Sequence, residues 1–211
     1  MGRAHRVILA SNNTGKLREI GEMLTGLHLE VLLQSQFAVP EVEETGLTFV
    51  ENAILKARCA AEHTGSPAIG DDSGIEVDAL DGKPGIYSAR YAGEGASDED
   101  NLWKLIEEVK QIPEGKRTAR FVCLMVYLRH AYDPDPVIAQ GIWEGIVITE
   151  PKGANGFGYD PMFYVPTHNC TSAELSPEVK NRLSHRGQAL NQLVHKLEAD
   201  DSVMHPLTQT Y

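Results

Sequence analysis

Two adjacent carboxylates, Asp71 and Asp72, are the residues of this sequence that most clearly suggest chemistry. They follow the apolar residues 68–70, which predict a short buried strand, and we expect the pair to lie where that strand ends. Carboxylate oxygens are the ligands that Mg²⁺ prefers in proteins, so the pair predicts a magnesium site. A turn or a helix N-cap uses the same residue types, and on this motif alone both interpretations stay open.

A second polar segment, residues 11–16, lies between an apolar run at residues 7–10 and a run with helical spacing. Gly15 and Lys16 directly precede the predicted helix, so free backbone N–H groups and an ammonium group would point at one place, which suits a phosphate. The Walker P-loop pattern is not met, because Lys16 is not followed by Ser or Thr. The alternative is an Asn-rich turn with a solvated lysine.

A triphosphate beside bare carboxylates would be strongly disfavoured. Two like charges about 4 Å apart repel by roughly 4 kcal/mol at an effective dielectric near 20. The acidic run of Glu41, Glu43 and Glu44 offers further oxygen ligands, although such a run is commonly a solvated loop. We therefore expect a divalent cation between the phosphates and the acidic side chains.

Two later segments carry aromatic and basic side chains. Residues 153–161 place Phe157 and Tyr159 among three glycines, so a flexible backbone would bring two rings close to a planar ligand. Lys180 and residues 184–187 lie between two predicted helices, where their donors suit the edge of a base or a phosphate. The alternatives are aromatic residues folded into the core and a connecting turn whose His and Arg face water.

Capping signals and hydrophobic periodicity predict the elements that must position these residues. Thr48 with Glu51 predicts the start of a helix that closes at Gly65, and Ser97 with Asp100 predicts the start of another. Strands are predicted at residues 7–10, 68–70, 121–128 and 137–148, the last two as an antiparallel pair, and further helices after residue 16, after Ser176 and up to Leu197. Helices interleaved with strands predict the α/β class with a mixed sheet.

The organisation of the chain is that of one domain over residues 1–211, with an ordered core at about residues 7–197. We expect loose segments only at residues 131–136 and after Leu197. The longest apolar runs are too short for a signal peptide or a membrane span, and Cys59, Cys123 and Cys170 lack the spacing of a zinc site, so we predict reduced thiols in a cytoplasmic protein without a membrane partner.

The net charge of −11 bears on the partner. An acidic surface repels the phosphate backbone of DNA or RNA, so we expect no nucleic-acid polymer as the main partner. A small phosphorylated ligand remains compatible with that charge, because cations gathered in a cleft dominate within a Debye length of about 8 Å.

Taken together, the motifs resemble those of the inosine triphosphate pyrophosphatase family, whose members cleave purine nucleoside triphosphates that carry a non-standard base. The similarity extends from about Val7 to Leu197. It is carried by residues 11–16, 43–46 with 51–53 and 56–57, 71–74, 84–91, 156–161 and 184–186. Because several motifs occur in the family's order, the match is specific.

This resemblance implies a long central mixed β-sheet flanked by helices, two lobes with the active-site cleft between them, and usually a homodimer. It also implies hydrolysis of ITP, dITP or XTP to monophosphate and pyrophosphate, with Mg²⁺ as cofactor and Asp72 as the catalytic acceptor that also binds the metal. Glu43 would be the first choice for a second metal ligand, before Asp71 and Glu44. The residues implied for substrate binding are Ser11, Asn12, Asn13, Thr14, Gly15, Lys16, Ser73, Phe157, Gly158, Tyr159, Asp160, Lys180, His185 and Arg186.

Two other functions stay open at this point. A pyrophosphatase of similar architecture would act on modified pyrimidine nucleotides, and a nucleotide sensor would bind without turnover. Rates measured with a panel of nucleoside triphosphates distinguish the pyrimidine enzyme from the purine enzyme. Release of pyrophosphate distinguishes an enzyme from a sensor.

Overall fold

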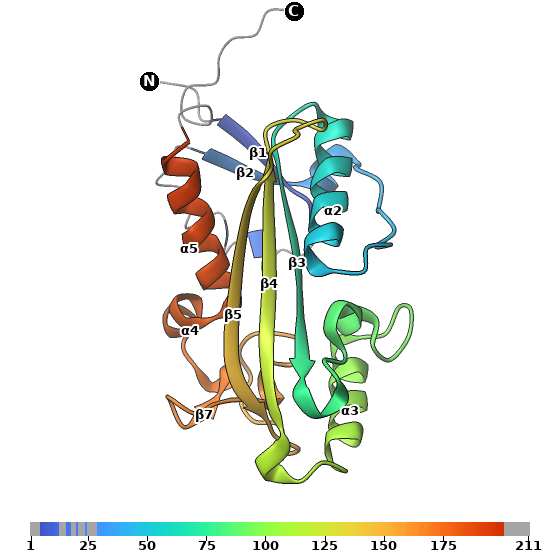
Figure 1. The fold of residues 1–211 in the computed structure, drawn as a ribbon, viewed down its shortest axis with the longest axis vertical. Coiled ribbons are helices and arrows are strands. Elements are labelled where there is room, and N and C mark those ends of the chain that lie inside the picture. The colour runs from blue at the N-terminus through green and yellow to red at the C-terminus, as the bar shows by residue number, and fades with distance from the viewer. Residues whose placement is uncertain (1–4, 13–15, 18–19, 21–23, 25–28, 201–211) are drawn as a thin grey trace, which may run out of the picture. The chain divides into compact units, whose positions relative to one another are not determined.

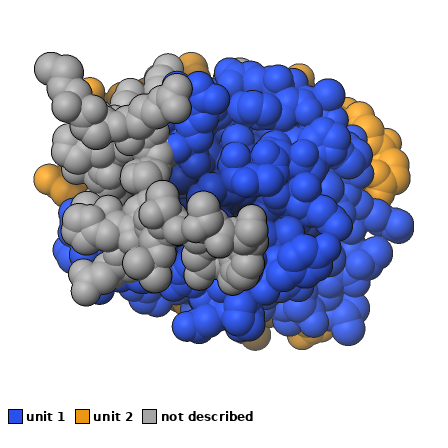
Figure 2. Space-filling model, turned by 90° about the horizontal axis from the view of Figure 1, so that it is seen from above, with its two compact units in different colours: residues 1–72, 124–140, 189–211 blue, residues 73–123, 141–188 orange. Residues whose placement is uncertain are grey.

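The computed structural model describes residues 5–12, 16, 17, 20, 24 and 29–200. The chain divides into two compact units, each built from separate stretches of sequence (Figure 2). Unit 1 comprises residues 1–72, 124–140 and 189–211, and unit 2 comprises residues 73–123 and 141–188.

Seven strands form one sheet in the order β2-β1-β3-β4-β5-β6-β7, flanked by helices (Figure 1). The strands are β1 (His5–Leu9), β2 (Leu29–Leu33), β3 (Ala68–Val77), β4 (Thr118–Leu128), β5 (Val137–Val147), β6 (Phe163–Val165) and β7 (Cys170–Thr171). Strand β1 pairs in parallel with β2 and β3, whereas β6 pairs antiparallel with β5 and β7. The predicted α/β class with a mixed sheet is therefore confirmed.

The predicted pairing of the two long strands is also supported by the backbone. The Val147 N–H, at the end of β5, donates to the carbonyl of Arg117, just before β4, at 2.9 Å. The start of one strand thus lies beside the end of the other, as in an antiparallel pair. Strand β4 begins three residues earlier than the sequence predicts, at Thr118.

Four longer helices have described bounds: α2 (Phe49–Thr64), α3 (Asp98–Val109), α4 (Pro177–Leu183) and α5 (His185–Glu198). The predicted caps are confirmed, because Thr48 accepts the Glu51 N–H, Ser97 accepts the Asp100 N–H and Ser176 accepts the Val179 N–H. Helix α2 ends at Thr64 and is capped by Gly65, whose left-handed backbone favours glycine. Among the described part of the chain, no helix is long and apolar enough to cross a membrane.

The core of unit 1 holds helix α2 against strand β3. The small side chains of Ala53 and Ala57 are completely buried on that face of α2. A Cβ atom at Gly70 would lie 2.0 Å from the carbonyl oxygen of Ala53, so only glycine permits this approach. This close packing fixes the helix beside the acidic residues of β3.

Strand β3 corrects the sequence-based prediction. The sequence predicts a strand that ends at residue 70, with Asp71 and Asp72 at its end, but both residues lie inside β3, which continues to Val77. Ile75 and Val77 are completely buried and extend the strand. Asp71 and Asp72 can stay in the sheet because Lys16 and Lys56 compensate their charges.

The segment at residues 131–136 is not loose. Asp133 is buried and accepts hydrogen bonds from the backbone N–H groups of Arg129 and Asp135 at 2.9 and 3.1 Å. The Arg129 guanidinium also binds Asp133, as well as Asp200 beyond the end of α5. These contacts order the connection between β4 and β5 because they satisfy its backbone groups.

Candidate functional site

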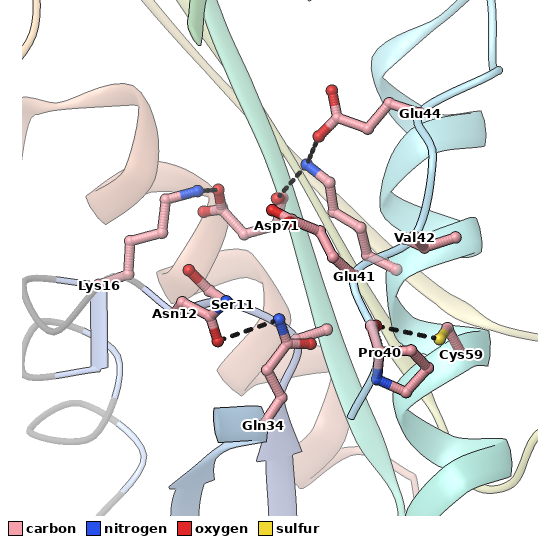
Figure 3. Close-up of a pocket in the computed structure, with 12 residues that line it drawn as sticks. Ser11, Asn12, Lys16, Gln34, Pro40, Glu41, Val42, Glu44, Cys59 and Asp71 are labelled. Atoms are coloured by element: carbon pink, nitrogen blue, oxygen red, sulfur yellow. Dashed lines mark hydrogen bonds and ion pairs between the residues drawn. The ribbon is translucent and has the colours of Figure 1, made fainter. Parts of the chain in front are cut away.

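Unit 1 contains a polar pocket of about 170 Å³ (Figure 3). This volume is below the roughly 300 Å³ at which ordinary ligand pockets begin, so it suits one part of a ligand rather than a whole nucleotide. Its polar lining residues are Ser11, Asn12, Lys16, Gln34, Glu41, Glu44, Lys56, Cys59 and Asp71. Residues of β3, of α2, of the segment before α2 and of the segment that follows β1 thus meet in one place.

Lys16 and Asp71 form an ion pair at this pocket (Figure 3). The Asp71 side chain is completely buried, and the Lys16 side chain is 16% exposed. An unpaired buried carboxylate would be strongly disfavoured, so Lys16 is held toward the pocket by the charge that it compensates.

Lys56 bridges two other carboxylates. Its Nζ lies 2.6 Å from Oδ1 of Asp72 and 2.5 Å from Oε1 of Glu44. Burial by itself would lower the pKa of Lys56, but the charges of Asp72 and Glu44 raise it above its ordinary value. The ammonium group is therefore charged and joins the strand that carries Asp72 to the segment that carries Glu44.

Asp72 has one carboxylate oxygen in use and one free of hydrogen bonds. Its Oδ1 accepts from Lys56, whereas its buried Oδ2 has no hydrogen-bond partner among the described residues. Burial raises the pKa of Asp72 and outweighs the lowering by Lys56, while Glu44 and Asp71 add to the increase. A buried oxygen without a donor is suited to accept a proton or to bind a cation.

The donor set of this pocket fits a cation shared with a ligand. No group of three or more His, Cys, Asp or Glu side chains within the described ranges is close enough to form a complete metal cage. Mg²⁺ is commonly held by one or two carboxylates together with substrate phosphates, so a full protein cage is not required. Asp72 does not itself line the pocket, but it is paired with the lining residue Lys56, and its unused Oδ2 is a candidate ligand of that kind.

Unit 2 contains a second group of charged residues, centred on Asp160. Its Oδ2 accepts from Nζ of Lys180 at 2.5 Å and from the Phe157 N–H at 2.8 Å, and its Oδ1 accepts from the Ser172 hydroxyl at 2.7 Å. A Cβ atom at Gly156, where φ is +77°, would lie 2.0 Å from Oδ2 of Asp160. Glycine is therefore needed for the turn to fold around this carboxylate.

Phe157 is the aromatic residue of this segment that reaches the surface, with 38% of it exposed. Nζ of Lys180 lies 5.2 Å from the centre of its ring and Cζ of Arg186 lies 5.4 Å from it, which are cation–π distances. Tyr159 is only 5% exposed, and its hydroxyl donates to the Ser88 carbonyl. Of the two aromatic residues predicted to face a ligand, Phe157 is thus accessible and Tyr159 is buried.

His185 and Arg186 form the first turn of α5, and Lys180 lies within α4. The prediction that Lys180 and residues 184–187 occupy a connection between helices is correct only for Ser184, which separates α4 from α5. Lys180, His185 and Arg186 are all buried, so a turn with its His and Arg in water is excluded. The His185 ring stacks on Phe121 at 4.7 Å, and Nη2 of Arg186 donates to Oγ of Ser73 at 3.4 Å.

The remaining predicted site residues lie partly at the unit 1 pocket and partly elsewhere. Ser11 and Asn12 line the unit 1 pocket, whereas Asn13, Thr14 and Gly15 lie outside the described residues. Glu43 is exposed and does not line the pocket, while Glu44 does. The Gly158 N–H donates to Oδ2 of Asp98 at 3.0 Å.

Sequence reasoning assigned no role to Lys56. A usable signal was present, because Lys56 lies between Ala53 and Ala57 on a helix whose small residues face the sheet. A lysine at the edge of such a face, close to an acidic strand, indicates a compensating charge. Ser172 was also missed, and no local pattern indicates its contact with Asp160.

These features define an α/β protein with a mixed sheet, a pocket of paired lysines and carboxylates in unit 1, and an aromatic and basic cluster in unit 2. Lysine side chains at a polar pocket beside carboxylates are typical of sites that bind phosphate together with a divalent cation.

A model of the Ham1 family matches residues 7–196, and the chain belongs to that family. A dITP/XTP pyrophosphatase of Vibrio parahaemolyticus is 58% identical over 194 residues, which cover 92% of this chain and 97% of the relative. The dITP/XTP pyrophosphatase of Escherichia coli K12 is 54% identical over 91% of this chain and 98% of its own length. The family resemblance inferred from the motifs is confirmed.

A solved structure supports the same assignment. The structure of a HAM1 protein from Coxiella burnetii has a TM-score of 0.87 and 48% sequence identity. The match covers 93% of this chain and 100% of that chain. The fold that the resemblance implied is therefore shared with a structurally characterised relative.

Proposed function

We propose that this chain hydrolyses purine nucleoside triphosphates with a non-standard base, such as dITP, ITP and XTP, to the monophosphate and pyrophosphate. The printed activity of its relatives supports this proposal, because they are dITP/XTP pyrophosphatases at 54–59% identity over most of the chain. The structural observation that carries it is the buried Oδ2 of Asp72, which has no hydrogen-bond donor among the described residues, in a carboxylate paired with Lys56 and close to the charges of Glu44 and Asp71.

Asp72 would orient the attacking water and accept its proton as the water attacks the α-phosphorus. Its raised pKa, caused chiefly by burial, makes the carboxylate a better proton acceptor than an exposed aspartate. Lys56 would hold Asp72 in position through Oδ1, which leaves Oδ2 directed to its role. Lys16 would exchange its contact with Asp71 for the polyphosphate and stabilise the charge on the leaving pyrophosphate.

Mg²⁺ is the proposed cofactor. When bound, it would neutralise the charge of the phosphates and polarise the α-phosphoryl group. Asp72 would be its first ligand, and Glu44, Asp71 and Glu43 are the candidates for a second. Between the two glutamates, the pocket geometry favours Glu44, because Glu44 lines the pocket and Glu43 does not.

The residues of unit 2 would recognise the base and adjoining groups. Inosine and xanthosine carry a 6-oxo acceptor where adenine carries an amino donor, so N–H donors of His185 and Arg186 directed at that position would meet an acceptor on ITP or XTP and a donor on ATP. A site built to bond one polar group rejects an analogue that lacks it by about 10⁴-fold or more. The exposed face of Phe157, near Lys180 and Arg186, would stack on the ring.

The decisive experiment is product analysis with dITP, ITP, XTP, dATP, dGTP and modified pyrimidine triphosphates in the presence of Mg²⁺. We expect monophosphate and pyrophosphate from the first three, and much slower turnover of the others. Equal rates for all nucleotides would refute the base preference. Binding without release of pyrophosphate would indicate the sensor instead, and diphosphate with inorganic phosphate would show a different cleavage site.

A homodimer and a cytoplasmic location remain predictions from the family resemblance. Gel filtration with light scattering tests the first, and fractionation of cells tests the second.

A further inference from the structure

Residues 84–91 form a motif to which the proposed function gives no role. Most of this motif is the 3₁₀ helix η4 (Gly85–Arg90) in unit 2. Only Ser88 is buried within η4, although it carries a polar side chain. Buried hydroxyl groups are normally bonded, and the partners of this one explain its position.

Ser88 joins two segments that carry predicted nucleotide-binding residues. Its Oγ accepts the Ile75 N–H at 3.0 Å and donates to the Gly85 carbonyl at 2.6 Å. Its own carbonyl accepts the Tyr159 hydroxyl at 2.7 Å. One buried residue therefore ties strand β3 to the glycine-rich segment at residues 153–161.

Both segments continue to groups that would contact a nucleotide. Two residues before Ile75 on β3 is Ser73, which accepts from Arg186. Two residues before Tyr159 is Phe157, whose partly exposed ring lies within cation–π distance of both Lys180 and Arg186. The residues bonded to Ser88 are thus two positions along the chain from Ser73 and from Phe157, which both contact Arg186.

The ring of Tyr159 is not available to a ligand. It is part of the hydrophobic core of unit 2, together with Ile75, Leu102 and Phe163. Burial raises the pKa of Tyr159 above its ordinary value, so its hydroxyl remains a proton donor at neutral pH. A buried phenol with a directed hydrogen bond fixes the backbone that carries it.

We propose that Tyr159 is a positioning residue, not a nucleotide contact: through Ser88 its hydroxyl fixes the segment that presents Phe157 to the base. This inference rests on the proposed function, because the base is that of the nucleotide proposed above. It gives the motif at residues 84–91 the role of a brace between β3 and the glycine-rich segment.

The test uses Tyr159→Phe, which keeps the ring and removes only the hydroxyl. We expect KM for XTP and dITP to rise about fivefold, the equivalent of one net hydrogen bond, while kcat changes by less than about twofold. If the ring contacted the base directly, Tyr159→Phe would keep that contact and KM would not change. An unchanged KM therefore overturns the proposal. Tyr164→Phe is the matched control, because its hydroxyl makes an exposed 3.4 Å contact with Asn169 away from this junction.

A second variant tests the path through Ser88. Ser88→Ala removes the hydroxyl that accepts the Ile75 N–H, and we expect a similar rise in KM. Because both residues act at one junction, KM of the double variant should rise by less than the product of the two single-variant increases. Fully multiplicative effects would show independent roles and would overturn the brace.

A third measurement separates this inference from the proposed function. Hydrogen exchange of the Phe157 and Gly158 amides, which are bonded to Asp160 and Asp98, should be faster in Tyr159→Phe than in wild type. This measurement needs no substrate. If wild-type protein releases no pyrophosphate from any purine triphosphate, the proposed function fails, whereas unchanged exchange in Tyr159→Phe refutes the positioning role.

Discussion

Units 1 and 2 both pair lysines with aspartates, but the pairs differ in burial and in how many acceptor positions are filled. In unit 1 the side chains of Lys16 and Lys56 are 16% and 18% exposed, and Oδ2 of Asp72 has no described donor. In unit 2 the side chains of Lys180 and Asp160 are 9% and 4% exposed, and both oxygens of Asp160 accept hydrogen bonds.

This difference separates two uses of the same residue types. A carboxylate with an unused oxygen, paired with a lysine that lines a pocket, is able to act on a ligand, and a lysine that lines the pocket is able to exchange its partner. A carboxylate whose oxygens are both satisfied in the interior instead fixes the groups around it. The comparison therefore assigns reactivity to Asp72 and a supporting role to Asp160.

Removal of divalent cations should have the largest effect. We expect EDTA to reduce pyrophosphate release to background, and an excess of Mg²⁺ to restore it, because the carboxylates of unit 1 would otherwise repel the triphosphate. The thermal unfolding temperature should stay nearly unchanged in EDTA, since the cation belongs to the substrate complex. An unaltered rate in EDTA would contradict the metal-dependent mechanism.

Asp72→Asn should lower kcat by roughly 10²–10⁴-fold, because it removes the proton acceptor at nearly constant shape. Steady-state kinetics with XTP measure this change, and urea unfolding should show only a small loss of stability. Asp81→Asn is the control, because Asp81 is exposed and its left-handed backbone, with φ of 53°, is tolerated by asparagine. Full activity of Asp72→Asn would remove Asp72 from the mechanism.

Asp160→Asn should give the opposite pattern, with a loss of roughly 3–5 kcal/mol in the free energy of unfolding, because Lys180 stays buried without its counter-charge. Urea denaturation measures the loss. The double variant Asp160→Asn with Lys180→Met should recover part of it, since the buried charge is then absent. If Asp160→Asn were as stable as Asp72→Asn, the contrast between the two units would be wrong.

Lys16→Ala should have the smallest of these effects, a rise in KM of roughly 10-fold to 100-fold, which corresponds to one charged hydrogen bond. Titration of rates against XTP concentration measures it. Lys110→Ala is the matched control, because Lys110 makes only a surface ion pair with Glu107. Equal KM values for the two variants would exclude Lys16 from phosphate binding.

Local signals predicted the starts of helices well. Thr48, Ser97 and Ser176 each accept a backbone N–H within three residues, so the interaction that defines the helix start is contained in a short stretch of sequence. The strand with Asp71 and Asp72 is longer than predicted, because the interactions that extend it come from residues distant in the sequence. The charges that allow those residues to stay in the sheet come from Lys16 and Lys56, which are 55 and 16 residues away from them.

The sequence by itself determined the α/β class, the helix caps and the membership of a family, because periodicity, capping pairs and ordered motifs are properties of neighbouring residues. Only the tertiary structure decided that Lys56 bridges Asp72 and Glu44, and that Phe157 is exposed while Tyr159 is buried. Residue type states that a side chain carries charge or an aromatic ring. Its partner and its access to water depend on packing between segments that are distant in the chain.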